Sequence, residues 1–220
     1  RLVELAIASS KILRIAESES FYRQAIELSP AETAANLNLS LLDLLQGRFA
    51  EGWPRYESRR PLLTHAPPQP AFGEEPWRAP ASLGGTTVRV VLEQGLGDTL
   101  QFIRYVPLLA ERGARVELAV PIHQSLLPLI RSVQGIAAEV ADAATEPVPE
   151  VVIPLLSLPL AFGTDASSIP QNIPYLTPSE DRRAKWRKIL GERTPAGDPR
   201  PRVGIVWSGS AGHANDRHRS

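Results

Sequence analysis

The sequence contains no cysteine and no methionine among its 220 residues. The absence of cysteine excludes disulfide bonds, thiolate metal sites and a thiol nucleophile. Because the chain also has no signal-like start, we expect a cytoplasmic protein. The absence of methionine, even at position 1, predicts that the chain is a fragment of a longer protein or a sequence from which residues are missing.

The chain also lacks an excess of either charge, because 24 basic residues balance 24 acidic ones. Neither nucleic acid nor an anionic membrane surface is matched by a neutral surface, so we expect no nucleic-acid partner. No uncharged apolar stretch reaches about eighteen residues, which predicts no integral membrane segment. Hydrophobic residues make up 43% of the chain, an ordinary content for a protein with a buried core.

Proline content and hydrophobic spacing divide the chain into four segments. In residues 1–60 apolar side chains recur every three or four positions, which is typical of helices. Residues 61–84 contain too many prolines for a helix or a central strand and predict an extended linker. Residues 85–178 alternate β-branched runs with helical stretches, so we expect a parallel sheet of right-handed β-α-β units. Residues 179–220 predict a helix and the beginning of a second α/β domain.

Individual elements follow from the same patterns. Helices 99–112 and 122–133 and a charged amphipathic helix at 180–190 are expected from their periodicity. Strands are expected at 86–92, 115–120, 137–140, 151–154 and 202–207.

The helical segment contains a faint repeat. The pairs that lie 34 residues apart are Ala6 and Ser40, Ser18 and Gly52, and Tyr22 and Tyr56. This is the tetratricopeptide spacing, in which small residues let two helices approach and an aromatic ring fills the space between them. Because two units cannot bury a solenoid core alone, we expect further repeats before them or docking on the following domain. An unspecialised helical hairpin is the alternative interpretation.

A glycine turn at residues 93–99 (EQGLGDT) separates the first expected strand from the helix that follows it. In open α/β sheets ligands bind beyond the carboxyl ends of strands, where a glycine turn lets them approach backbone N–H groups. The candidate ligand-binding residues of this turn are Gln94, Gly95, Gly97 and Thr99. Asp98 has two interpretations: an acid that caps the helix, worth about 1 kcal/mol, or a general base that deprotonates a bound hydroxyl.

The same turn leaves a nicotinamide-dependent enzyme as a third, less favoured possibility. A dinucleotide-binding fingerprint requires a third glycine where Leu100 stands. Glu117, about twenty residues further on, nevertheless lies where an acid would bind the ribose.

A second small-residue turn follows the last expected strand. Its candidate ligand-binding residues are Ser208, Gly209, Ser210, Arg217 and Arg219. Arginine forks and backbone amides suit a phosphate or diphosphate. Basic residues outnumber acidic ones in 180–220 and the reverse holds in 85–179, as expected if one half binds an anionic donor and the other a neutral acceptor. A solvated basic tail is the alternative. No Asp-x-Asp or His-Glu-x-x-His pattern occurs, so we predict no metal site.

The run 88–109 (VRVVLEQGLGDTLQFIRYVPLL), the strand after Gly113 and the helix to Gly135 resemble the N-terminal Rossmann-like domain of bacterial heptosyltransferase-type glycosyltransferases. Residues 203–220 resemble the start of their donor-binding domain. Helical repeats ahead of such a pair resemble bacterial tetratricopeptide proteins that carry a glycosyltransferase-like region. The resemblance implies tetratricopeptide-like helical pairs, a Rossmann-like domain of GT-B type and the start of a second one.

The resemblance also implies an activity, the metal-independent and inverting transfer of a sugar from a nucleotide-sugar to a hydroxyl acceptor. The nucleotide-sugar is then a substrate and no further cofactor is expected. Asp98 stands at the position of the proposed catalytic base, and the repeats would recruit a protein or glycan acceptor. Arg219 stands where the family often has lysine; it keeps the charge that stabilises the departing phosphate but does not readily donate a proton.

A hypothesis of a different class is a non-catalytic interaction scaffold, in which the repeats bind a partner and the glycosyltransferase-like domain is degenerate. Fold alone does not decide between the two, because one fold can carry many functions or none.

Overall fold

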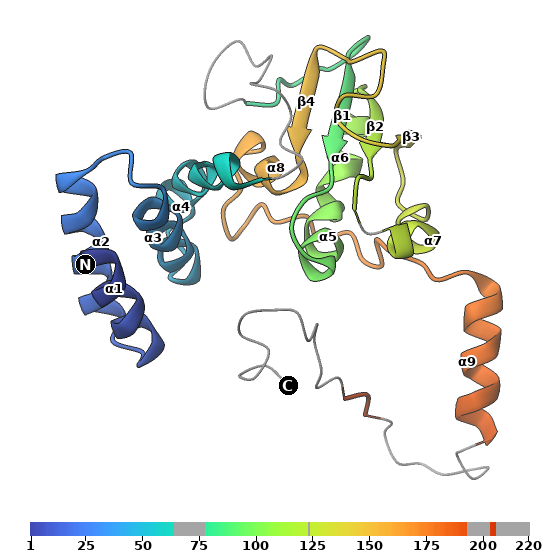
Figure 1. The fold of residues 1–220 in the computed structure, drawn as a ribbon. Coiled ribbons are helices and arrows are strands. Elements are labelled where there is room, and N and C mark those ends of the chain that lie inside the picture. The colour runs from blue at the N-terminus through green and yellow to red at the C-terminus, as the bar shows by residue number, and fades with distance from the viewer. Residues whose placement is uncertain (64–77, 123, 193–202, 206–220) are drawn as a thin grey trace. The chain divides into compact units, whose positions relative to one another are not determined.

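The structure is a computed structural model that describes residues 1–63, 78–122, 124–192 and 203–205 (Figure 1). The chain divides into two compact units, Arg1–Pro178 and Ser179–Ser220. In the first unit, helices precede a parallel sheet; the second contains α9 (Glu180–Glu192), the helix expected at 180–190. Among the described residues, no helix is both long enough and apolar enough to cross a bilayer.

The first unit begins with four α-helices that pack in consecutive pairs (Figure 1). They are α1 (Leu2–Lys11), α2 (Ile15–Leu28), α3 (Thr33–Leu45) and α4 (Phe49–Tyr56), with the 3-10 helix η1 (Glu57–Leu62) directly after α4. In each pair, a small residue of the second helix lies against the first helix, and these two residues, Ser18 and Gly52, are 34 residues apart. In the first pair the Ser18 hydroxyl donates a 2.8 Å hydrogen bond to the carbonyl of Ala6. In the second, Gly52 lies so close to Leu44 that an added Cβ would stand 2.7 Å from its Cδ2.

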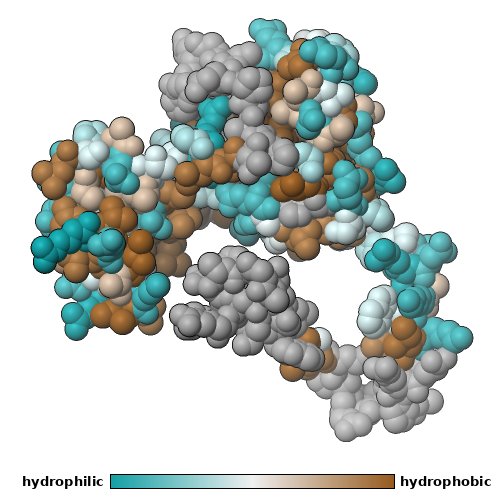
Figure 2. Space-filling view, in the orientation of Figure 1, coloured by the Kyte–Doolittle hydropathy of each residue, from teal (hydrophilic) through white to brown (hydrophobic). Residues whose placement is uncertain are grey.

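The helical pairs leave apolar side chains on their surface. Figure 2 shows hydrophobic patches among hydrophilic residues on this part of the molecule. The exposed large side chains of α1 to α3 and their connections are Leu5, Ile12, Leu13, Leu28, Leu41 and Leu45. The two pairs therefore do not bury all of their own apolar surface, as the length of the repeat segment predicts.

The sheet has four strands, all parallel, in the order β3-β2-β1-β4. The strands are β1 (Thr87–Val91), β2 (Arg115–Ala119), β3 (Ile136–Val140) and β4 (Val151–Pro154), and they confirm the four strands expected between residues 86 and 154. Val88 in β1 lies opposite Val116 in β2 and Val151 in β4, which makes β1 a central strand. The β-branched runs form these strands because both faces of the central ones are covered.

The helices of this region differ from the prediction. The expected helix 99–112 begins three residues earlier as α5 (Leu96–Phe102), passes through η2 (Ile103–Tyr105) and continues as α6 (Val106–Glu111). Pro107 has no N–H to donate, which favours an interruption just before it. The expected helix 122–133 is wrong in length, since only η3 (Gln124–Leu126) and α7 (Leu127–Ile130) form, the latter around Pro128.

After β4 the chain forms η4 (Leu155–Ser157) and α8 (Leu158–Ala161). The strand expected at 202–207 does not form at 203–205, and its other residues lie outside the described ones. Part of the proline-rich segment packs against the sheet domain. Leu83 is buried, and the Ala79 N–H donates a 2.9 Å hydrogen bond to the Ala161 carbonyl.

One hydrophobic core joins the second helical pair to the sheet. Trp53 and Tyr56 of α4 belong to the same buried cluster as Val88, Val90 and Leu118 of the strands. The Trp53 indole N–H also donates a 3.0 Å hydrogen bond to the Thr164 carbonyl, beyond α8. The second helical pair is therefore docked on the α/β domain through its aromatic residues.

The close contact of α4 with α3 can be tested at Gly52. We expect Gly52→Val to lower the free energy of unfolding by about 1–3 kcal/mol, because the added methyl groups overlap Leu44. Valine has a higher helix propensity than glycine, so a loss of stability comes from packing. Urea unfolding measures the change, and Ala50→Val, at an exposed position of the same helix, is the control. Equal effects of the two substitutions would contradict this packing.

Candidate functional site

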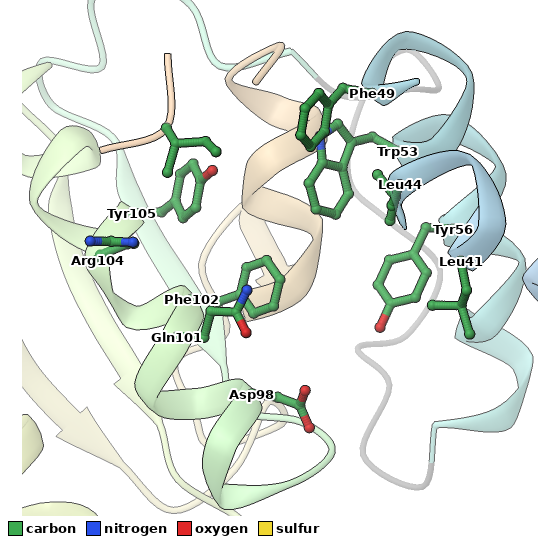
Figure 3. Close-up of a pocket in the computed structure, with 11 residues that line it drawn as sticks. Leu41, Leu44, Phe49, Trp53, Tyr56, Asp98, Gln101, Phe102, Arg104 and Tyr105 are labelled. Carbon is green, nitrogen blue, oxygen red and sulfur yellow. The ribbon is translucent and has the colours of Figure 1, made fainter. Parts of the chain in front are cut away.

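A cavity of about 420 Å³ lies between the second helical pair and the first helix of the α/β domain (Figure 3). Its aromatic side chains come from both parts, so neither forms the cavity alone. The lining residues are Leu41, Leu44, Phe49, Trp53, Tyr56, Asp98, Gln101, Phe102, Arg104, Tyr105 and Ile169. A volume of this size is in the usual range for a small-molecule site, which is lined by apolar residues and a few polar groups.

Asp98 caps its helix and also lines the cavity. It is the third residue of α5, and its Oδ2 accepts a 2.9 Å hydrogen bond from the N–H of Gly95, which caps the helix. Gly95 permits this approach, because a Cβ there would stand 2.9 Å from the same oxygen. Oδ1 has no hydrogen-bond partner among the residues described, and the side chain lines the cavity. One carboxylate oxygen therefore holds the helix while the other is available to a ligand.

Of the other residues predicted for this turn, none lines the cavity in the described structure. Gln94 instead contacts a lining residue, since its amide donates a 3.0 Å hydrogen bond to the hydroxyl of Tyr56. Thr99 is fully buried, whereas Gly97 is exposed and an added Cβ would meet nothing within 4 Å.

The predicted donor-side residues form no part of this site as described. Ser208, Gly209, Ser210, Arg217 and Arg219 all lie outside the described residues.

Several lining residues were missed from the sequence. Three of them, Gln101, Phe102 and Tyr105, follow Asp98 at helical spacing. This spacing predicts that they share one face of a helix with the aspartate, so the sequence contained a signal for them. Arg104, three residues after Gln101, has a helical spacing too, but it lies in η2, which interrupts the continuous helix that the sequence predicts.

Among the lining side chains, only Asp98 and Arg104 carry formal charge. The two tyrosines stay protonated, because burial raises the pKa of both the Tyr56 and the Tyr105 phenol above the ordinary value. The nearby Asp98 carboxylate raises the pKa of Tyr56 further, although Arg59 opposes it. The cavity thus offers one anion and one cation within aromatic walls.

Arg59 of η1 lies at the ends of the central strands. Its guanidinium pairs with Glu93, just beyond β1, at 2.7 Å and donates a 2.9 Å hydrogen bond to the hydroxyl of Ser157, just beyond β4. Glu93 also accepts a 2.9 Å hydrogen bond from the N–H of Leu156. The β1–β4 boundary is where the chain order of the sheet reverses, the place where open α/β sheets usually bind ligands. Here an arginine from the helical segment occupies that place, and the cavity lies on the outer face of α5.

Glu117 is not available to bind a ribose. It lies in the middle of β2, where its carboxylate accepts a 2.7 Å hydrogen bond from the buried guanidinium of Arg89. The possibility of a nicotinamide-dependent enzyme therefore loses the acid on which it depended.

The fold and the cavity define an α/β domain with a four-stranded parallel sheet, joined to helical pairs that form one wall of its candidate site. Within the described residues, no group of three or more acidic or histidine side chains is arranged to hold a metal ion.

The chain is similar to Protein FlbA of Caulobacter vibrioides, with 28% identity over 181 residues. The match covers 74% of this chain and 29% of FlbA, so the chain spans less than a third of that relative's length. No known family profile matches the chain. No solved structure matches it either.

The buried ion pair of Arg59 and Glu93 can be tested by substitution of Arg59. We expect Arg59→Met to lower the free energy of unfolding by about 3–5 kcal/mol, because it leaves the Glu93 carboxylate buried without its cation. Arg131→Met is the control; it removes an exposed pair with Glu139 and should cost less than about 1 kcal/mol. Chemical denaturation compares the two, and similar losses would contradict the burial of the Arg59 pair.

Proposed function

We propose that the protein is an inverting glycosyltransferase that moves a sugar from a nucleotide-sugar to a hydroxyl acceptor bound in the cavity, with Asp98 as the general base. The observation that carries the proposal is the position of the Asp98 carboxylate, which lines an aromatic cavity while its Oδ1 is available. The strand-turn-helix context of this aspartate supports the resemblance to the heptosyltransferase-type domain.

In the proposed reaction, Asp98 takes the proton of the acceptor hydroxyl as the oxygen attacks the anomeric carbon. The new bond forms on the face opposite the leaving group, and the bond between that carbon and the nucleoside diphosphate breaks with its electrons on the phosphate oxygen. Because charge develops on the leaving group, fixed donors are most effective there. The resemblance assigns that role to Ser208, Gly209, Ser210, Arg217 and Arg219, with no metal ion.

The helical pairs are proposed to be tetratricopeptide-like repeats that recruit the acceptor. Equivalent small residues at the two helix contacts, 34 residues apart, support this. The α/β domain is proposed to be the N-terminal half of a GT-B pair, whose donor half begins in residues 179–220.

The alternative is a non-catalytic scaffold in which the cavity binds a partner. The use of Asp98 Oδ2 as a helix cap favours it, because a cap alone explains an acid at this position. The exposed leucines of the helical pairs also suit a binding surface.

Asp98→Asn separates the two functions. Asparagine still accepts the hydrogen bond from Gly95 but cannot take a proton at neutral pH, so the fold and donor binding should persist. We expect turnover with the preferred nucleotide-sugar to fall at least about 100-fold. The donor is first found by a thermal-shift screen of UDP-, GDP-, ADP- and CMP-sugars with the full-length protein.

Glu51→Gln is the matched control, because Glu51 is the third residue of α4 as Asp98 is of α5, yet it is exposed and does not line the cavity. Turnover of this variant should equal that of the wild type. Loss of turnover in both variants would point to a general effect on the fold and contradict a specific role of Asp98, and a wild type that binds no nucleotide-sugar would favour the scaffold.

A further inference from the structure

Arg104 is the cation of the cavity. It takes part in no ion pair among the described residues, and its Nε is buried there without a hydrogen-bond partner. The buried arginines of the same unit behave differently, because Arg59 pairs with Glu93 and Arg89 with Glu117 at 2.7 Å each. The buried Nε is out of reach of a ligand, but the terminal N–H groups are not among the buried atoms, and a ligand oxygen in the cavity that Arg104 lines is their natural partner.

The guanidinium of Arg104 is held in place before any ligand binds. Its central carbon lies 4.6 Å from the centre of the Tyr175 ring, a cation–π contact. The Tyr175 hydroxyl in turn donates a 3.0 Å hydrogen bond to the carbonyl of Leu100 in α5, which fixes the ring. A stacked arginine presents its remaining N–H groups as an ordered fork that matches a carboxylate or a phosphate.

Arg104 and the proposed general base, Asp98, line different parts of the cavity. In Figure 3, Asp98 and Arg104 lie on opposite sides of Phe102, with Gln101 between them on the same helical segment. A ligand that lies along this segment therefore meets a carboxylate at one end, an amide in the middle and a guanidinium at the other end. The aromatic walls suit the apolar faces of a sugar ring, and the volume limits the ligand to a small molecule.

We infer that the cavity binds a sugar that carries an oxyanion, a carboxylate or a phosphate, with Arg104 holding the anion while a hydroxyl faces Asp98. This inference rests on the proposed function, since it takes the cavity to be the acceptor site. It differs from the expectation of a neutral acceptor, which followed from the acidic excess of residues 85–179. The acidic excess is a sum over the domain, whereas the charges that face a ligand are those of the cavity.

The test compares the binding of glucuronate, glucose 6-phosphate and glucose to the full chain by saturation-transfer NMR at constant ionic strength. We expect one or both anionic sugars to bind the wild type at least about tenfold more tightly than glucose. Arg104→Gln should remove that preference and leave glucose binding unchanged. Arg104→Lys keeps the positive charge but not the forked N–H groups, so it should keep part of the preference for anionic sugars. The two anionic probes show whether the site prefers a carboxylate or a phosphate.

Arg112→Gln is the matched control, because Arg112 also stacks on an aromatic ring, that of Phe162 at 4.5 Å, but does not line the cavity. It should keep the preference for the anionic sugars. Equal binding of all three probes, no binding of either anion, or tighter binding of an acidic peptide than of both anions would overturn the inference.

The outcome is independent of turnover. If Asp98→Asn keeps full transfer activity while Arg104→Gln loses the preference for anions, the proposed catalytic base fails and the anion site stands. If Arg104→Gln keeps the preference while Asp98→Asn abolishes transfer, the anion site fails and the proposed function stands.

Discussion

The buried pair of Arg59 and Glu93 is the interaction on which the rest of the first unit depends. It joins the end of the helical segment to the end of the central strand, two positions 34 residues apart in the chain, and both side chains are nearly inaccessible to water. Removing two charges from water is expensive, so the pair is tolerated only because Ser157, Glu57 and the Leu156 N–H satisfy its remaining groups. The network therefore constrains geometry more than it adds stability.

That constraint explains the location of the cavity. Glu93 is the first residue of the turn that carries Asp98, and Gln94, the second, is hydrogen-bonded to Tyr56 of α4. The helical segment thus holds the turn at two consecutive residues and occupies the usual ligand position at the reversal of the sheet. The space that remains lies along α5, where α3 and α4 supply the opposite wall. A ligand in this cavity therefore contacts both parts of the unit at once, the helices α3 and α4 and the segment that carries Asp98.

The sequence predicted what depends on local pattern. Runs of β-branched residues specify the strands, and small residues at 34-residue spacing mark the two helix contacts. The prediction of one helix over 122–133 was wrong because Pro128 cannot stand in a helix interior, although the apolar residues around it have helical spacing; α7 begins only at Leu127. The Arg59–Glu93 pair and the hydrogen bond from Trp53 to a carbonyl 111 residues away could not be predicted, because no local pattern encodes long-range partners. The same holds for Arg104, whose importance depends on the absence of a partner among the described residues.

The two carboxylate oxygens of Asp98 bring structure and proposed chemistry into one side chain. A general base works best when its geometry is fixed before the substrate arrives, and the hydrogen bond from Gly95 to Oδ2 provides that orientation at the start of a short helix. The residue that caps the start of α5 thus also lines the cavity, so one side chain links the beginning of this helix to the candidate site.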